Sequence, residues 1–208
     1  MNMSNAPQSS SAILVPVPLT PEAFAPFGAV LQAPSPVGLG GGNDRGDTRE
    51  SGLSRVAAEA RAAAQTGAGR AINGGTAERF DLVDDLQLGA RGGRAQLAVF
   101  RAQARRFPLE LQALERHQWG SQTFVPWGRG RFVAVVAAAG PAPQADALHA
   151  FVTDGHQGIV LWPGTWHHAL VAVDAGDFLV IERAGPEADC DIHTLPAPVL
   201  LPRSFLPP

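Results

Sequence analysis

Residues 115–128 bring together side chains that could transfer protons or bind a metal ion. Glu115 and His117 are two residues apart, so on a β-strand both side chains would point to the same face. Gln122 follows a turn-prone Gly-Ser pair, and a hairpin there would return its amide to the side of the first two. An imidazole beside a carboxylate can serve general acid–base catalysis or a metal site.

A second stretch, residues 158–168, ends in two adjacent histidines. An apolar run precedes Pro163-Gly164, which suits a type II turn because proline favours its second position and glycine accepts a positive φ at its third. His167 and His168 would face opposite sides of a strand, so at most one of them would join a given site. His167 is a candidate base or ligand, whereas His168 is more typical of a structural residue.

The segments around these residues have the pattern of short strands. Phe132–Ala137 is a continuous apolar run, which predicts a buried strand. Further strands are expected at Phe27–Gln32, Gln96–Ala102, Ala147–Thr153, Gly155–Leu161 and Asp177–Arg183. Thr20 as N-cap and Pro21 as first helical residue predict a short helix, Pro21–Ala25. Strands at this spacing, with turn residues between them, favour a β-sandwich or barrel.

Composition and charge narrow the class of protein. The 208 residues are 45% hydrophobic and 17% charged, which fits one globular domain, and a net charge of −3 gives no basic surplus for a nucleic-acid partner. The N-terminus lacks a basic region and a long apolar core, so neither a signal peptide nor a membrane span is expected. Cys190 is the only cysteine, which rules out an intrachain disulfide and suits the cytoplasm.

We expect residues 1–12 to form a flexible tail and residues 13–208 to form one domain. Within this domain, about residues 34–70 are expected to be a flexible or partly helical insertion. A Gly-rich start is followed by Leu53–Gln65, an Ala-rich stretch with one apolar helical face. We interpret the insertion as an addition to the surface, with a lid over the site as the alternative.

The two stretches together resemble the two motifs of the cupin superfamily. The first cupin motif runs His-x-His, then an acid, then Gly, and the matching positions here are Glu115, His117, Gln122 and Gly128. The second runs Gly, then Pro-x-Gly-x-x-His, and the matching positions are Gly158, Pro163, Gly164 and His167. In this chain an acid replaces the first histidine, and an amide, which is a weaker ligand for a hard cation, replaces the acid.

A longer string resembles the ureidoglycolate lyase family. It consists of Glu-Arg-His from position 115, Gly-x-Gln-x-Phe-x-Pro from 120, and Trp-His-His from 166. Further matches are Ile72-Asn-Gly-Gly, Asp177-Phe-Leu, Glu182-Arg-Ala-Gly and Cys190-Asp191, and they extend from about Leu19 to Leu195. The resemblance implies a mainly β fold, a cupin-like double-stranded β-barrel with a few short peripheral helices, assembled as a homodimer. The insertion at about 34–70 departs from the family, whose link there is much shorter.

The activity implied by the resemblance is that of a lyase, which cleaves ureidoglycolate to glyoxylate and urea in allantoin catabolism. This reaction needs a base at the hydroxyl, an acid at the leaving nitrogen and a cation for the carboxylate. The implied catalytic residues are His117, His167 and Glu182, and the implied substrate-binding residues are Asn73, Arg101, Gln122 and Arg183. A divalent metal, nickel by the resemblance, would be bound by Glu115, His117, Gln122 and His167, and no organic cofactor is expected.

Three alternatives stay open. A hydrolase that acts on the same substrate and releases ammonia would need overlapping site groups. A non-catalytic cupin that binds a small carboxylic acid would use the same pocket without turnover. A metal dioxygenase fits less well, because Glu115 and Gln122 stand where a histidine and an acid are expected. The fold alone decides none of these, and the sequence leaves open which histidine carries which proton.

Overall fold

The computed structural model describes residues 11–33 and 69–206. The chain divides into two compact units, residues 1–31 with 85–208 and residues 32–84. Residues 1–10 of the predicted tail lie outside the described residues, and so do residues 34–68 of the predicted insertion with its helix at Leu53–Gln65. The single domain predicted for residues 13–208 stays a prediction.

Two sheets build the first unit. The larger sheet has the order β1-β15-β7-β12-β9-β10-β2, with β13 paired to β9. Its strands are β1 (Ala12–Ile13), β2 (Val17–Pro18), β7 (Leu109–Arg116), β9 (Phe132–Ala137), β10 (His149–Val152), β12 (Trp166–His167), β13 (Val171–Ala172) and β15 (Asp191–Leu201). The smaller sheet has the order β3-β11-β8-β14-β6. Its strands are β3 (Gly28–Leu31), β6 (Arg94–Ala102), β8 (Gln122–Pro126), β11 (Gly158–Leu161) and β14 (Gly176–Ala184).

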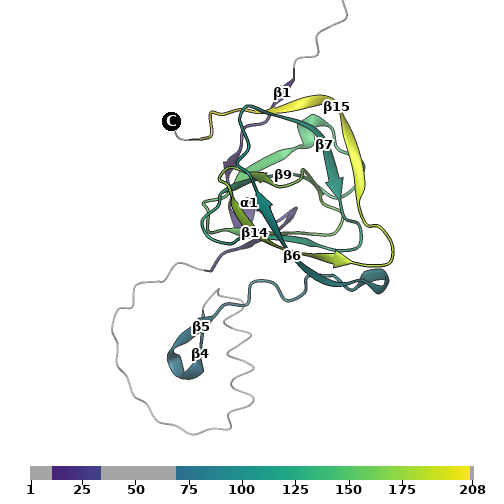
Figure 1. The fold of residues 1–208 in the computed structure, drawn as a ribbon. Helices are drawn as coiled ribbons and strands as arrows, with labels where there is room; N and C mark the ends of the chain where they lie inside the picture. The colour runs from purple at the N-terminus through teal and green to yellow at the C-terminus, as the bar shows by residue number, and fades with distance from the viewer. Residues whose placement is uncertain (1–10, 34–68, 207–208) are drawn as a thin grey trace, which may run out of the picture. The chain divides into compact units, whose positions relative to one another are not determined.

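The strands of this unit curl around an interior, as Figure 1 shows for β7, β9, β14 and β15. Residues 12–18 join the two ends of the larger sheet, because β1 pairs with β15 while β2, a few residues later, pairs with β10. In the described part of this unit, helical structure is limited to α1 (Pro21–Phe24) and the short 3₁₀ helices η2 (Ala90–Gly92) and η3 (Ala145–Ala147). The prediction of a mainly β, cupin-like barrel with a few short helices is confirmed.

Two hydrophobic cores lie on opposite faces of β9. The inter-sheet core contains Phe132, Ala134 and Val136 of β9 together with side chains of the smaller sheet, such as Phe124 and Phe178. The second core contains the alternate β9 residues and side chains of β7 and β15. Both faces of β9 are therefore buried, which explains why its sequence is continuously apolar rather than alternating.

The helix cap and the turn predicted from the sequence are present in the structure. Thr20 caps α1, its hydroxyl accepting a hydrogen bond of 3.2 Å from the Ala23 N–H, and Phe24 of this helix is fully buried. Gly164 has a φ of +84°, and the Thr165 N–H donates to the Trp162 carbonyl at 3.1 Å, as the predicted turn requires. Among the described residues, no helix is both long and apolar enough to cross a membrane.

The second unit contains one described hairpin. Strands β4 (Arg70–Ile72) and β5 (Ala77–Arg79) pair antiparallel, and the 3₁₀ helix η1 (Asn73–Gly75) connects them. Asn73 has a φ of 52°, and the two glycines after it are also in the left-handed region. The Asn-Gly signal for a hairpin is therefore confirmed.

Candidate active site and metal centre

The ends of two neighbouring strands place Glu115, His117 and His167 together. Glu115 of β7 lies in register with His167 of β12, and His117 follows the end of β7. The Gly164 N–H donates to the His117 carbonyl at 2.6 Å, so the turn before β12 is attached to the residue after β7. One ligand atom from each of the three side chains lies within 4.8 Å of the other two. The predicted meeting of the two sequence motifs is thus observed in the structure.

Backbone carbonyls fix the orientation of both histidine rings. The Nδ1 of His167 is 3.0 Å from the Thr165 carbonyl, and the Nδ1 of His117 is hydrogen-bonded to the Asp189 carbonyl. A carbonyl only accepts, so each Nδ1 carries a proton, and in the neutral ring each Nε2 keeps a lone pair. Both Nε2 atoms are buried without a hydrogen-bond partner among the described residues. Imidazoles held in this way by an outer hydrogen bond are typical of metal ligands.

A carboxylate completes this group. Glu115 Oε1 lies 3.5 Å from His167 Nε2, and the Glu115 side chain is only 26% exposed. When His167 Nε2 is protonated, its hydrogen bond and its charge lower the pKa of the Glu115 carboxyl below the ordinary value, although burial opposes this shift. Two imidazole nitrogens and one carboxylate, with ligand atoms this close together, fit a divalent cation by charge and by donor type.

Gln122 and Glu182 approach from the smaller sheet. They are paired in register on β8 and β14, and Gln122 Nε2 donates to Glu182 Oε2 at 2.9 Å. Two residues from Gln122 along β8 is Phe124, which belongs to the inter-sheet core, so Gln122 points into the same interior. His167 pairs with Val136 of the same core from the larger sheet. The Gln122 Oε1 is buried and has no hydrogen-bond partner among the described residues, as an additional ligand oxygen would be.

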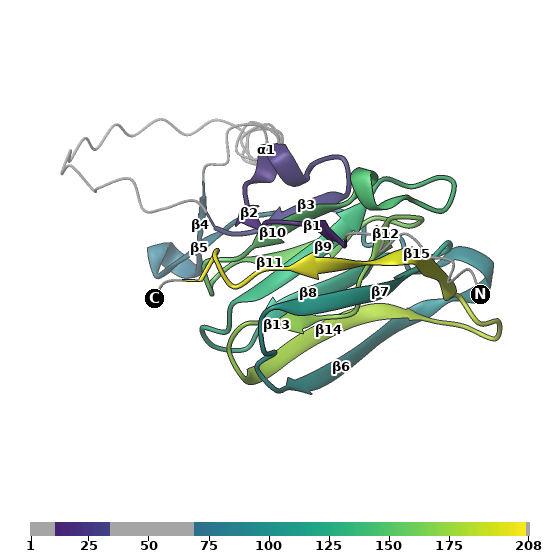
Figure 2. The same ribbon diagram turned by 90° about the horizontal axis from the view of Figure 1, so that it is seen from above.

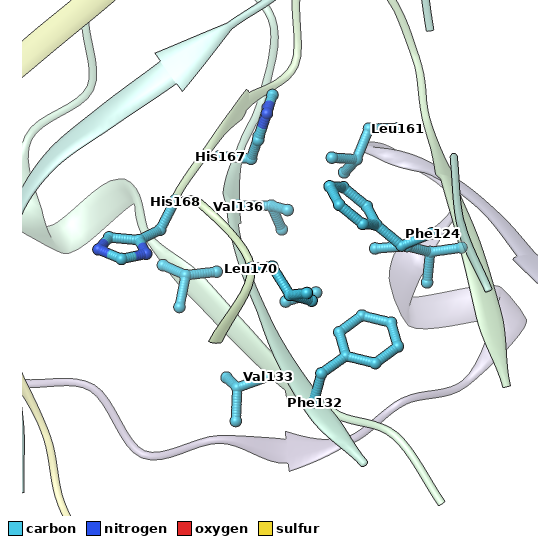
Figure 3. Close-up of a pocket in the computed structure, with 11 residues that line it drawn as sticks. Phe124, Phe132, Val133, Val136, Leu161, His167, His168 and Leu170 are labelled. Atoms are coloured by element: carbon cyan, nitrogen blue, oxygen red, sulfur yellow. The ribbon is translucent and has the colours of Figure 1, made fainter. Parts of the chain in front are cut away.

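The two adjacent histidines face different ways, as predicted. Figure 3 shows His167 and His168 leaving the strand in different directions, with Leu161 and Phe124 on the His167 side. An apolar pocket extends from His167 into the inter-sheet core. His168 also lines an open groove together with Glu115, Glu110 and Gln112, among other residues. Burial lowers the pKa of His168, and its Nδ1 is bound to the Ala169 carbonyl at 2.8 Å.

Arg101, predicted to hold the substrate carboxylate, is paired with another residue. Its guanidinium donates two hydrogen bonds to Asp177, at 2.8 and 3.0 Å, and its side chain is 80% exposed. Asp177 is five residues from Glu182 along β14, which corresponds to roughly 17 Å. The structure does not bring Arg101 to the Glu115–His117–His167 group, and its substrate role stays a prediction.

The two other predicted substrate-binding residues outside this group are Arg183 and Asn73. Arg183 points to the opposite face of β14 from its neighbour Glu182, because side chains alternate along a strand. Its Nε donates to the Ala90 carbonyl at 2.8 Å and its Nη2 to the Arg91 carbonyl at 3.2 Å. Asn73 lies in the second unit, in the β4–β5 connection. The substrate roles of both residues stay predictions.

Asp189 is a residue that sequence reasoning missed. Besides the bond from its carbonyl to His117, its carboxylate accepts the N–H groups of Gln118, at 2.7 Å, and Trp119, at 3.1 Å. It therefore attaches the segment after β14 to the segment after β7 and holds one of the candidate ligands. The only sequence signal was its position before the Cys190-Asp191 match, and nothing there indicates a partner some 70 residues away.

The fold and this group of residues define a cupin-like barrel with a candidate metal centre at the interior ends of β7 and β12. A family model described as ureidoglycolate lyase matches residues 11–202, and the chain belongs to that family. Among the similar proteins is "Ureidoglycolate lyase" of Burkholderia cepacia, 45% identical over 58% of this chain and 68% of that protein. Another of the same name, from Pseudomonas syringae pv. syringae, is 35% identical over 86% of this chain and 88% of its own length. A third, from Azotobacter vinelandii, is 41% identical over 59% and 74%.

Proposed function

We propose that this chain is a lyase that cleaves ureidoglycolate to glyoxylate and urea in allantoin catabolism. The family membership and the names of the relatives support the substrate and the reaction type. The observation that carries the site is the pair of buried Nε2 atoms of His117 and His167, which lie beside the Glu115 carboxylate and lack hydrogen-bond partners among the described residues.

The reaction breaks the bond between one carbon atom and its ureido nitrogen. Ureidoglycolate carries a carboxylate on the carbon that also bears its hydroxyl and its ureido nitrogen. When a base removes the hydroxyl proton, the oxygen forms the aldehyde of glyoxylate and the carbon–nitrogen bond breaks. The electron pair leaves on the nitrogen, which takes a proton from an acid and becomes part of urea.

We assign a divalent metal to Glu115, His117 and His167, with Gln122 Oε1 as a further ligand. Nickel is the ion that the family resemblance implies, and imidazole nitrogens suit it. When bound, such an ion supplies positive charge for the substrate carboxylate and lowers the pKa of a coordinated hydroxyl group. The two ring nitrogens are already held in the ligand tautomer by the carbonyls of Thr165 and Asp189.

Glu182 is our candidate for the proton transfer that the ligands do not perform. The Gln122 amide holds one of its oxygens, and the alternation along β14 points its side chain into the inter-sheet core, where Val180 is buried. The open groove lined by Glu115 and His168 is our candidate for the approach of the substrate. If no metal is bound, His117 and His167 are the alternative bases, since each keeps a lone pair on Nε2.

We also propose that the protein is a cytoplasmic homodimer. The family resemblance implies the dimer. A reducing compartment suits a chain whose one cysteine, Cys190, is free and exposed.

Turnover of racemic ureidoglycolate tests the proposed function, with urea, ammonia and glyoxylate followed separately in the presence and absence of a chelator. Equal amounts of urea and glyoxylate without ammonia are expected, with loss of turnover after chelation and recovery on adding Ni²⁺. Ammonia in place of urea would establish the hydrolase instead. The absence of turnover above the nonenzymatic rate, with any divalent metal, would favour the non-catalytic cupin.

A further inference from the structure

The free edges of the two main sheets are not alike. The ends of the larger sheet are β1 and β2, with two residues each, and β2 contains Pro18. One end of the smaller sheet is β3, with four residues. The other end is β6, with nine residues and no proline. Short strands and prolines protect sheet edges from pairing with another chain, and β6 has neither protection.

The β6 edge also carries exposed apolar side chains. Leu97 is 66% exposed, Val99 48% and Phe100 39%. One side of β6 is paired with β14 over its full length, and no described strand pairs with the other side. Figure 2 shows β6 as the outermost strand, next to β14. A long edge with apolar residues and backbone groups available for hydrogen bonding is a surface made for another strand.

We propose that β6 is the edge by which two copies of this chain pair, antiparallel and about a two-fold axis, so that their five-stranded sheets become continuous. The inference rests on the homodimer proposed above and adds the surface that forms it. A two-fold arrangement uses the same edge on both copies, so each β6 covers the other and this pairing stops at two copies.

The side chains select one register. In an antiparallel pair centred on Ala98, Leu97 of one copy lies opposite Val99 of the other, and Gln96 lies opposite Phe100. A centre at Val99 would instead place Leu97 opposite Arg101. A centre at Leu97 would place Phe100 opposite Arg94. The register about Ala98 keeps the apolar pairs together and places both arginines opposite alanines.

The charges at the ends of β6 do not oppose this pairing. Arg101 is neutralised by Asp177 of its own chain through two hydrogen bonds. Arg94, at the other end of the strand, lies opposite Ala102 in the register about Ala98. Repulsion between arginines of the two copies is therefore avoided in this register, since no arginine faces another.

The test is the mass of the full-length protein in solution, measured by analytical ultracentrifugation over a range of concentrations. The double variant Leu97→Lys/Val99→Lys places four lysines in the proposed interface and costs no core contact, because both side chains point to solvent. We expect the unchanged protein to be a dimer and the dissociation constant of the double variant to rise by roughly 100-fold or more. The matched control is Val15→Lys, since Val15 is 52% exposed and lies in the N-terminal segment, and we expect it to remain dimeric.

A monomeric unchanged protein, or a double variant that remains as dimeric as the control, would overturn the proposal. Dissociation caused by Val15→Lys alone would move the interface to the N-terminal segment. Hydrogen exchange of the unchanged protein provides a second measurement that needs no variant. Half of the β6 amides are paired with β14 in any case, and the remaining ones should lose their protection on dilution below the dissociation constant. Both measurements are independent of turnover, so a failed lyase assay leaves this result standing.

Discussion

The two ends of strand β14 carry polar pairs of opposite character. At one end, Asp177 is bound to Arg101 by two hydrogen bonds on an exposed surface. At the other end, Glu182 accepts one hydrogen bond from the Gln122 Nε2 atom. The side-chain oxygen of Gln122, Oε1, is buried and has no hydrogen-bond partner among the described residues. The first pair is complete in itself, whereas the second leaves an acceptor available.

This difference distinguishes an ordinary surface ion pair from a candidate binding site. Exposed ion pairs contribute little to stability, and their charges are screened by water and salt. A buried polar atom without a partner is costly, and native proteins rarely keep one unless a ligand, ion or water binds it. The incomplete end of β14 faces the interior into which His167 also points, and we therefore place the chemistry there.

We expect the largest effect on metal binding and turnover from removal of the His167 ring. His167→Ala should abolish tight metal binding and lower turnover by roughly 10³-fold, because it removes a ligand nitrogen that no neighbour replaces. The matched control is His168→Ala, which removes the adjacent imidazole on the other face of the strand. Metal content by mass spectrometry and kcat/KM are the measurements. Equal losses in the two variants would contradict the assignment of His167.

Removal of the amide at the incomplete end should have the next largest effect. Gln122→Leu leaves the Glu182 carboxylate without its hydrogen-bond donor, so we expect a loss of about 1–3 kcal/mol in unfolding free energy and reduced turnover. Denaturant unfolding and steady-state kinetics measure the two quantities. Gln122→Glu is a useful second variant, since it restores the acid of the cupin motif but places its carboxylate beside that of Glu182. A fully active, equally stable Gln122→Leu would exclude both roles.

Asp189 is predicted to act on the centre through His117. Asp189→Ala removes the carboxylate that holds the Gln118 and Trp119 amides and should displace the carbonyl that fixes the ring. Losses of outer hydrogen bonds of this kind weaken metal binding by roughly 10- to 100-fold. Calorimetric titration with Ni²⁺ measures the effect. Asp177→Ala is the control from the complete end of β14, and an equal loss there would mean that the change in Asp189→Ala is merely structural.

The ion pair between Asp174 and Arg131 indicates how much an exposed charge pair contributes to stability. Asp174 accepts two hydrogen bonds from the Arg131 guanidinium, which hold the pKa of its carboxyl below its ordinary value. The folded state therefore binds this proton less readily than the unfolded state, and the contribution to stability is present at neutral pH and lost as the pH falls. Asp174→Asn should cost about 1 kcal/mol at pH 7, and the two unfolding curves should converge below about pH 4. A difference that grows on acidification would contradict this sign.

Much of the fold was visible in the sequence because local patterns specify it. The continuous apolar run of β9 predicted a buried strand, and the structure covers it on both faces. The Pro163-Gly164 turn and the Thr20 cap are also present where they were predicted. The alternation of side chains along a strand was enough to place Glu115 with His117 and to separate His167 from His168.

The remaining features depend on register between distant strands, which no local pattern encodes. Arg101 meets Asp177 across 76 residues of sequence, and a strand-end arginine gives no indication that its charge is already paired. Asp189 reaches the residues after β7 because β15, which begins two residues later, pairs with β7. The Gln122–Glu182 hydrogen bond likewise follows from the pairing of β8 with β14 rather than from either sequence segment.

The smallest effect is expected at the complete end of β14, where Arg101 was predicted to hold the substrate carboxylate. If the ion pair with Asp177 is its main role, Arg101→Ala should change KM by less than about twofold, because exposed pairs contribute little. If the guanidinium exchanges Asp177 for the substrate, KM should rise roughly tenfold or more, since a charged hydrogen bond is lost.

Asp177→Ala then distinguishes these two cases, because the change expected in KM has the opposite sign. It would lower KM only if Arg101 binds substrate, because the competing carboxylate is gone. A raised KM in the first variant with a lowered KM in the second would extend the site along β14 and remove the contrast between its ends.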